Sequence, residues 1–291
     1  MSGSDASGSV PRTLTGDVLT RAHQSGRAAL VGYLPAGFPS VQGAVDAAKV
    51  LIDAGTDVVE LGLPYSDPSM DGPVIQRAVD QALRSGVRIR DVLATVEQVA
   101  SYSSGTAVLV MTYWNPVLRY GVDAFARDLV SAGGAGLITP DLTPDSGPAW
   151  VRTADANDLD KVFLVAPSST QQRLADTVAA CRGFVYAASL MGVTGERASV
   201  GDQAQLLVTR AREAAALTGG PEHVCVGLGV STPEQAAEVA RYADGVIVGS
   251  ALVRCLLDAG EDAAAGRSRL AEVAAALVAA VHSGRGAREP V

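Results

Sequence analysis

Two carboxylates, Glu60 and Asp71, have the residue type and the surroundings to do chemistry. Glu60 lies inside the apolar run Val58–Gly62, where a buried carboxylate is costly unless the protein uses it. Asp71 follows eleven residues later, in a loop interrupted by prolines and glycines that ends at Pro73. The apolar run predicts a strand, and Pro73 is typical of the first turn of a helix. If both belong to a β/α barrel, the two acids lie at its C-terminal end, where such barrels carry out catalysis.

The surroundings of the two acids predict two different roles. A glutamate among apolar neighbours has a raised pKa, which suits a group that gives and takes a proton near neutral pH. Asp71 would then act as a fixed charge or a hydrogen-bond acceptor. The alternatives without chemistry are an ion-paired strand residue for Glu60 and an ordinary turn or helix cap for Asp71.

Other reactive side chains are placed less favourably. Lys49 and Lys161, the only lysines, fall in the middle of a predicted helix and at the start of a predicted strand. A Schiff-base mechanism is therefore disfavoured, and carbon–carbon cleavage would have to proceed by acid–base chemistry. His23, His223 and His282 fall at helix ends or before strands, and no metal-binding motif is present, so no metal is expected.

A regular alternation of short apolar strands and helices would position the two acids. The strands are rich in Val, Ile and Leu without polar alternation, as expected of strands buried on both faces in a parallel sheet. Eight β/α units in ~250 residues predict an α/β fold, a (β/α)8 TIM barrel, with an extra N-terminal helix at Leu14–Gln24. A doubly wound sheet is the alternative, disfavoured because no Gly-x-Gly-x-x-Gly follows the first strand. The predicted strands are Ala28–Tyr33, Val58–Gly62, Val108–Thr112, Gly136–Thr139, Val162–Val165, Phe184–Ala187, Val224–Gly227 and Val246–Val248.

The connections and the chain ends complete this prediction. The pattern predicts loops around Trp114-Asn115-Pro116 and after the sixth strand as far as Gly201, and a break in the last helical region near Gly260 and Gly266. Residues 12–284 are predicted to form a single TIM-barrel domain. The Ser/Gly-rich residues 1–11 are expected to be a disordered tail, and residues 285–291 a frayed C-terminal tail.

Glycines after the last three predicted strands favour a phosphate site. They occur in Gly192-Val193-Thr194-Gly195, in Gly227-Leu228-Gly229 and in Gly249-Ser250. Barrels frequently bind phosphate at the last two loops and at a helix N-terminus, where backbone N–H groups can approach the anion. A tight turn would explain one such segment, but three in succession favour the phosphate. Tyr113 and Tyr186, near strand ends, favour a flat apolar substrate.

Composition and charge restrict the class of partner. The 291 residues are 48% hydrophobic and 19% charged, which is enough for a large core. The net charge of −8 argues against nucleic acid or an anionic membrane as a partner. No signal peptide and no membrane span are predicted. Cys181, Cys225 and Cys255 lack Cys-x-x-Cys spacing and are interpreted as buried reduced thiols, so a cytoplasmic location is expected.

The segment from Glu60 through Asp71 strongly resembles the signature of the tryptophan synthase alpha chain family. The resemblance extends from about Leu14 to the last helix, with one departure at Gly37-Phe38-Pro39, where many members have Gly-Asp-Pro. Further matching segments are Gly32-Tyr-Leu-Pro-Ala-Gly, Met111-Thr-Tyr-Trp-Asn-Pro, Thr139-Pro-Asp-Leu, Phe163-Leu-Val-Ala-Pro, Gly192-Val-Thr-Gly, Gly227-Leu-Gly-Val and Val248-Gly-Ser.

The resemblance implies a TIM-barrel lyase that cleaves indole-3-glycerol phosphate to indole and glyceraldehyde 3-phosphate in tryptophan biosynthesis. It implies that Glu60 is the general acid and base and that Asp71 accepts a hydrogen bond from the indole N–H. Tyr186 would lie beside the indole, and Thr194 would meet Asp71 when the loop after the sixth strand closes. The matching pocket positions are Tyr33, Met111, Tyr113, Ile138, Val165 and Leu228, and the matching phosphate positions are Gly195, Gly229, Gly249 and Ser250.

The resemblance also implies a partner. Family members pair with a pyridoxal-phosphate beta chain in a heterotetramer of two alpha and two beta chains, and indole passes through a tunnel to the partner. The alpha chain itself would need no cofactor, and its loops after the second and sixth strands would carry the allosteric signal. One alternative is a catalytically weak barrel that mainly activates the beta chain. Another is a cyclase similar to indole-glycerol-phosphate synthase, but that chemistry relies on a lysine at the mouth of the barrel.

Overall fold

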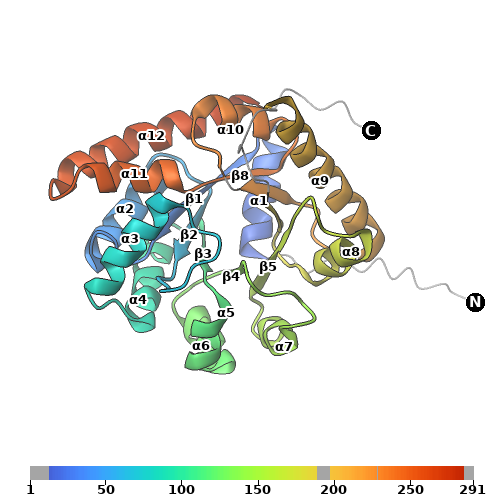
Figure 1. Ribbon diagram of the computed structural model, residues 1–291, viewed down its shortest axis with the longest axis horizontal. Helices are drawn as coiled ribbons and strands as arrows, with labels where there is room; N and C mark the ends of the chain where they lie inside the picture. The colour runs from blue at the N-terminus through green and yellow to red at the C-terminus, as the bar shows by residue number, and fades with distance from the viewer. Residues whose placement is uncertain (1–12, 189–196, 228, 285–291) are drawn as a thin grey trace, which may run out of the picture.

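The strands of the computed structural model form a closed parallel barrel. The structure describes residues 13–188, 197–227 and 229–284, with side chains described except at 197–201, so both expected tails lie outside it. Within these residues eight strands pair in chain order, and β8 pairs with β1, which confirms the predicted TIM barrel (Figure 1). The strands are β1 (Ala29–Pro35), β2 (Val58–Gly62), β3 (Ala107–Met111), β4 (Gly136–Thr139), β5 (Asp160–Val165), β6 (Val185–Ala188), β7 (Val224–Gly227) and β8 (Gly245–Val248).

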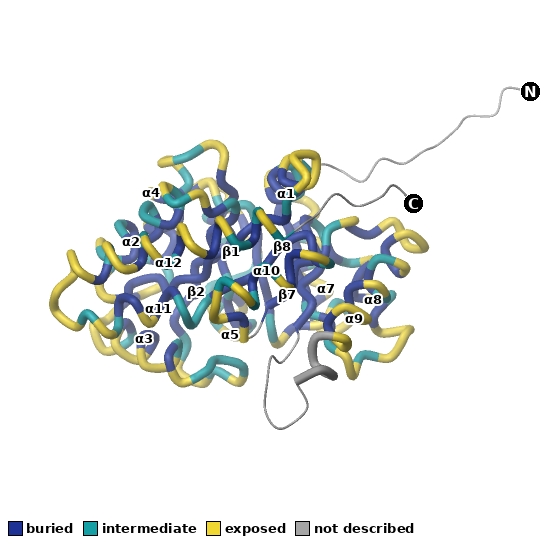
Figure 2. Tube along the Cα trace, turned by 90° about the horizontal axis from the view of Figure 1, so that it is seen from above, coloured by how far each residue is buried: buried dark blue, intermediate teal, exposed yellow. Residues whose placement is uncertain are grey.

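The helices surround the strands, except for α1, which lies behind the barrel in Figure 1. Their exposed residues face outward, and the strands between them are buried (Figure 2). The helices are α1 (Leu14–Gln24), α2 (Val41–Asp53), α3 (Pro73–Arg84), α4 (Ile89–Ala100), α5 (Trp114–Tyr120), α6 (Val122–Ser131), α7 (Pro148–Ala156), α8 (Gln171–Ala180), α9 (Arg197–Thr218), α10 (Pro233–Ala240), α11 (Ser250–Asp258) and α12 (Ala263–Gly284).

Two apolar clusters lie on opposite sides of the barrel wall. Alternate strand residues point to opposite faces, so each strand contributes to both clusters. On β2, Val58 belongs to the interior cluster, whereas Val59 and Leu61 belong to the cluster between the strands and the helices. Glu60 therefore points into the barrel. The interior cluster consists of Val18, Leu19, Ala22, Ala29, Val31, Val58, Ala107, Leu109, Ile138, Val162, Phe184, Tyr186, Ala188, Cys225 and Ile247.

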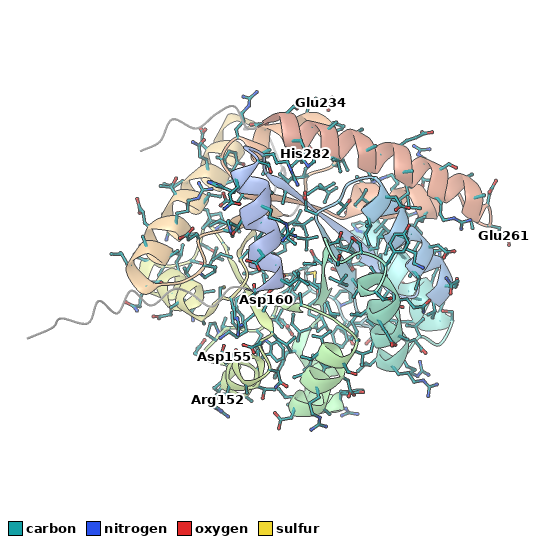
Figure 3. The ribbon with its side chains drawn as sticks, turned by 180° about the vertical axis from the view of Figure 1, so that it is seen from behind. Arg152, Asp155, Asp160, Glu234, Glu261 and His282 are labelled. Atoms are coloured by element: carbon teal, nitrogen blue, oxygen red, sulfur yellow. The ribbon has the colours of Figure 1, made fainter. Side chains whose placement is uncertain are left out.

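Helix α1 closes the end of the barrel at which the strands begin. Its apolar side chains belong to the interior cluster, and its first turn is capped by Thr13, whose Oγ1 accepts a hydrogen bond from Gly16 N at 3.1 Å. Figure 3 shows Asp160, the first residue of β5, near one end of α1. Burial raises the pKa of Asp160, and the facing side chains of Thr15 and Thr13 oppose that rise. The extra helix predicted at Leu14–Gln24 is thus present, and it closes this end of the barrel.

Two helices begin where loops were predicted. Residues Trp114–Tyr120 form α5, although Pro116 lies within them. A proline is tolerated there because the N–H groups of the first helical turn have no partner inside the helix. Helix α9 begins at Arg197, within the segment through Gly201 that was predicted to be a loop. Because these two helices begin earlier than predicted, the connections that follow the strand ends at the mouth of the barrel are shorter than expected.

The last helical region is interrupted once within the described residues. Gly260, with φ +57°, lies between α11 and α12, as predicted. Gly266 was also expected to break the helix, but it lies inside α12 and is buried. A Cβ at Gly266 would lie 3.1 Å from Ala259 Cβ and 3.5 Å from Leu256 Cδ2. The glycine therefore permits close helix packing, which the sequence pattern does not distinguish from a break.

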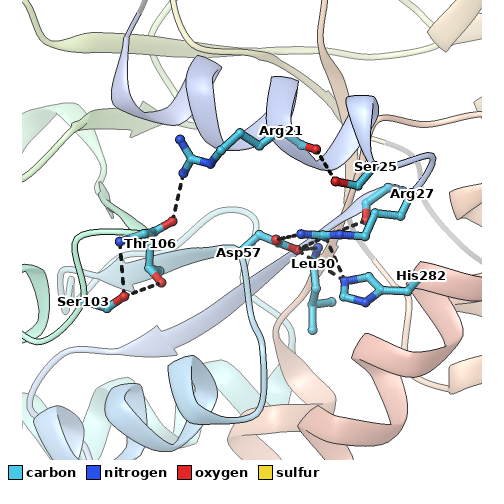
Figure 4. Close-up of polar contacts among 10 residues, drawn as sticks. Arg21, Ser25, Arg27, Leu30, Asp57, Ser103, Thr106 and His282 are labelled. Carbon is cyan, nitrogen blue, oxygen red and sulfur yellow. Dashed lines mark hydrogen bonds and ion pairs between the residues drawn. The ribbon is translucent and has the colours of Figure 1, made fainter.

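A largely buried carboxylate joins three elements at the end of the barrel where the strands begin. Asp57, just before β2, forms two hydrogen bonds with the guanidinium of Arg27, at 2.7 and 2.9 Å. Its Oδ2 also accepts a hydrogen bond from Leu30 N at 2.9 Å, and His282 Nε2 lies 3.7 Å from the same oxygen (Figure 4). The network ties β1 and β2 to the end of α12.

Removing this carboxylate should destabilise the barrel. We expect Asp57→Ala to lower the free energy of unfolding by about 3 kcal/mol, because it removes the carboxylate that pairs with the partly buried guanidinium of Arg27 and accepts a hydrogen bond from Leu30 N. Urea denaturation measures the change. The matched control is Arg90→Ala, because Arg90 is 83% exposed and lies 3.9 Å from Asp91 in a surface pair. That change should be below about 0.5 kcal/mol. Equal losses in the two variants would contradict a structural role for Asp57.

Candidate active site

Glu60 is a buried carboxylate without a balancing cation. The residue is 1% exposed, and its Oε2 has no hydrogen-bond partner in the described part of the chain. Burial, and secondarily the charge of Asp71, raise the pKa of Glu60 to about 8. None of the salt bridges formed by the described residues includes Glu60, so the alternative of an ion-paired strand residue is not supported. A carboxyl group of this kind can both give and take a proton near neutral pH.

Asp71 lies in the loop between β2 and α3 and is half-buried. Helix α3 is capped by Gly72 and begins with Pro73, so Asp71 is not the cap that the sequence left open. The amide of Gln76 holds the loop by donating a hydrogen bond to the Asp71 carbonyl oxygen at 2.8 Å. Burial raises the pKa of the Asp71 carboxyl group. The charge of Asp71 also acts on Glu60, so the two predicted acids share one site.

Three tyrosines surround the two acids. Tyr33 and Tyr186 are 6% and 3% exposed, and burial raises the pKa of each hydroxyl well above its usual value. The charges of Glu60 and Asp71 contribute to both of these shifts. Burial also raises the pKa of Tyr113, with a smaller contribution from Asp71. The structure therefore brings together Tyr33, Glu60, Asp71, Tyr113 and Tyr186 from four separate segments.

The loop after β2 is fastened to the end of β3. The Tyr113 hydroxyl accepts a hydrogen bond from Met70 N at 3.0 Å. The ring of Tyr65 stacks on that of Tyr113 with 5.2 Å between the ring centroids. These contacts fix the residue before Asp71. The sequence analysis did not single out Tyr65 or Met70, and the only available signal was their position between the two acids.

The predicted apolar pocket positions stay predictions, but the structure shows which of them face the barrel interior. Ile138 belongs to the interior cluster, and Met111 packs against it. Val165 does not reach this pocket, because it pairs with Ala187 and both belong to the outer cluster. Its neighbour Leu164 pairs with Tyr186 and packs inside the barrel. Leu164 thus takes the place that Val165 was expected to fill.

The phosphate site stays a prediction, and the structure describes three of its expected positions, Gly229, Gly249 and Ser250. Gly229, after β7, has φ +99°, a left-handed conformation that favours glycine. Gly249 follows β8 and caps α11, so Ser250 is the first residue of that helix, where backbone N–H groups are free to bind an anion. A cavity of about 180 Å³ beside Ser250 is also lined by Arg254 and Arg269, which the sequence did not suggest. Thr194, Gly195 and Leu228 lie outside the described residues.

Neither lysine reaches the site, as predicted. Lys161 is the second residue of β5, at the opposite end of the barrel, where it pairs with Asp155. The ammonium of Lys49, on α2, lies over the Tyr102 ring, 5.1 Å from its centroid. This placement opposes the lysine-dependent cyclase. Within 13–188, 197–227 and 229–284, no group of three or more His, Cys, Asp or Glu residues is arranged to hold a metal, and no helix is long and apolar enough to cross a membrane.

The fold and the site define a class of protein, a (β/α)8-barrel enzyme with a buried carboxyl group of raised pKa at the mouth of its barrel. The family model described as "Tryptophan synthase alpha chain" matches residues 19–282. The chain belongs to the tryptophan synthase alpha chain family, and it is a lyase of tryptophan biosynthesis. The resemblance found in the sequence is thereby confirmed, and the catalytically weak activator is not favoured.

Individual relatives cover nearly the whole chain. The tryptophan synthase alpha chain of Acidothermus cellulolyticus is 57% identical over 266 residues, which are 91% of this chain and 97% of the relative. That of Mycobacterium marinum is 60% identical over 232 residues, which are 80% and 84% of the two chains. A structure of Mycobacterium tuberculosis tryptophan synthase is similar with a TM-score of 0.83 at 52% identity, covering 94% of this chain and 99% of that chain. Membership in the family implies that the chain works with a beta chain.

Proposed function

We propose that this chain cleaves indole-3-glycerol phosphate to indole and glyceraldehyde 3-phosphate, with Glu60 as the general acid and base. The observation that carries the proposal is the Glu60 carboxyl group. It is buried at the mouth of the barrel with one oxygen unpartnered and a pKa of about 8. Such a group is protonated in a large fraction of molecules at neutral pH and is readily ionised when a substrate proton is transferred.

The proposed chemistry is a retro-aldol step. Glu60 gives its proton to the indole ring carbon that bears the glyceryl chain. The bond between that carbon and the chain then breaks as the adjacent glyceryl hydroxyl loses its proton and becomes the aldehyde. Glu60 takes up that proton, so that no net proton is consumed. Asp71 accepts a hydrogen bond from the indole N–H and stabilises the positive charge that develops on the ring.

The proposed substrate has two ends, and the site offers a region for each. Tyr186 and Tyr113 would flank the flat ring, with Met111, Ile138 and Leu164 in place of the expected Val165. The phosphate would bind at Gly229, Gly249 and Ser250, where glycines and a helix N-terminus are present and two arginines line the adjoining cavity. Thr194, Gly195 and Leu228 keep the roles that the resemblance implies for them.

The finer details of the assembly are also proposals. We infer a heterotetramer of two alpha and two beta chains, in which only the beta chain carries pyridoxal phosphate and receives the indole. The acid–base route needs no cofactor in this chain, because Glu60 moves both protons. The three cysteines are buried and free, which supports a cytoplasmic location.

Indole release tests the proposed activity. We expect the purified full-length chain to release indole from indole-3-glycerol phosphate by itself, and to do so faster when the beta chain is present. Indole can be measured colorimetrically, and the aldehyde can be measured with a coupled dehydrogenase. Absence of cleavage both alone and with the beta chain, together with activation of the beta chain, would instead support the catalytically weak barrel.

A further inference from the structure

The resemblance places Tyr33 in an apolar pocket, but the structure puts its hydroxyl in a polar position. Tyr33 lies directly opposite Glu60 in the pairing of β1 with β2. A Cβ built on Gly62 would lie 2.2 Å from Tyr33 Oη, so the hydroxyl lies over the backbone at the end of β2. This position is close to Glu60 and to the start of the Asp71 loop.

The ring of Tyr33 reaches the other end of the site. A Cβ built on Gly249 would lie 3.2 Å from Tyr33 Cδ1, so the ring packs against the glycine that caps α11. Tyr33 thus contacts the proposed phosphate turn with its ring and faces the acids with its hydroxyl. The segment of substrate that must pass between these two regions is the glyceryl chain.

The Tyr33 hydroxyl is available to a ligand. It has no hydrogen-bond partner among the described residues, whereas the Tyr113 hydroxyl is occupied by Met70 N. Burial and the charges of Asp71 and Glu60 raise the pKa of Tyr33 well above its usual value, so the hydroxyl keeps its proton and can donate it. A bound substrate oxygen would give this donor a hydrogen-bond partner inside the site.

We propose that Tyr33 is a positioning residue whose hydroxyl donates a hydrogen bond to a glyceryl hydroxyl of the substrate. This inference rests on the proposed function, because it requires a polyol chain between a ring and a phosphate. The hydrogen bond holds the glyceryl chain so that the hydroxyl that must lose its proton faces Glu60. It also makes the site select a hydroxylated chain over a plain alkyl chain, since the latter leaves Tyr33 unpaired.

The test compares two ligands in an inactive background. Glu60→Gln should slow turnover roughly a thousandfold. The dissociation constants of indole-3-glycerol phosphate and of 3-indolylpropyl phosphate, which lacks the glyceryl hydroxyls, can then be measured by calorimetry. Adding Tyr33→Phe should weaken binding of the hydroxylated ligand about threefold to tenfold and leave the binding of 3-indolylpropyl phosphate unchanged. In the active chain, Tyr33→Phe should lower kcat as well as raise KM, because the chain is also misplaced.

The matched control is Tyr102→Phe, which removes a hydroxyl bonded to Asp53 on the outer surface and should change neither ligand. Equal weakening of both ligands by Tyr33→Phe would show a merely structural role and overturn the proposal, as would no change in either. Failure of either ligand to bind to the Glu60→Gln chain, with no indole released by the unmodified chain, would defeat the proposed function and this inference with it. If the unmodified chain cleaves the substrate and Tyr33→Phe has the same kcat, KM and ligand affinities, the inference fails while the proposed function stands.

Discussion

Replacing Glu60 with glutamine is expected to lower kcat for indole release roughly a thousandfold, within the range that general acid–base catalysis contributes. Glutamine has nearly the same shape and can still form hydrogen bonds, but it can neither give nor take the transferred proton. The loss should therefore appear in kcat, with little change in the binding of 3-indolylpropyl phosphate. Steady-state indole release and calorimetry measure the two quantities separately. Near-normal turnover by the Glu60→Gln variant would show that Glu60 is not the general acid and base.

The same substitution should make the barrel more stable at alkaline pH. The folded-state pKa of Glu60 is raised from 4.5 to about 8. The folded protein therefore binds more protons than the unfolded chain between these values. The stability associated with protonated Glu60 is fully present below pH 4.5 and is lost as the pH rises through about 8. Glutamine removes this dependence, so Glu60→Gln should gain in urea midpoint relative to the unmodified chain as the pH increases.

A matched control separates this effect from a general effect of lost charge. Glu97 is exposed on α4, outside the barrel. Glu97→Gln should change neither indole release nor the slope of stability against pH. A gain in stability that is independent of pH, or that is equal in the two variants, would show that Glu60 does not carry the buried charge.

The sequence predicted the barrel well because its strands are short and apolar throughout. The same property conceals which residue of a strand faces inward. Along Val162–Val165 every residue is apolar, so composition alone gave no reason to choose Leu164 over Val165. The choice follows only from pairing, which places Leu164 beside Tyr186. On β2 the inward-facing residue was easier to identify, because Glu60 is the only polar side chain in an apolar strand.

The site residues were predictable where a polar residue interrupts an apolar pattern. They were less predictable where their role depends on the three-dimensional positions of side chains and backbone. The sequence indicated both acids but could not tell that Gly72, rather than Asp71, caps α3. The family resemblance placed Tyr33 among apolar pocket residues, whereas the position of its hydroxyl depends on packing against Gly62 and Gly249. Contacts of this kind join residues far apart in the chain, so no local pattern records them.

Replacing Asp71 with asparagine is expected to lower kcat for indole release roughly a hundredfold, the scale on which loss of one preorganised electrostatic partner acts. Asparagine can still accept a hydrogen bond from the indole N–H, but it carries no charge to stabilise the positive ring. The fold should survive, because the loop is held by the backbone of Asp71 through Gln76 and by Met70 through Tyr113. Circular dichroism checks the fold, and indole release measures the loss.

The pH dependence distinguishes Asp71 from Glu60. The negative charge of Asp71 contributes to the raised pKa of Glu60, although burial contributes more. In Asp71→Asn the pKa of Glu60 should therefore fall, and the limb of the kcat/KM profile that Glu60 controls should move to lower pH while remaining present. Residual activity of Glu60→Gln should lack that limb altogether. An Asp71→Asn profile with the limb unmoved would show that the two carboxylates act independently, and an unchanged kcat would show that the indole N–H does not need the charge.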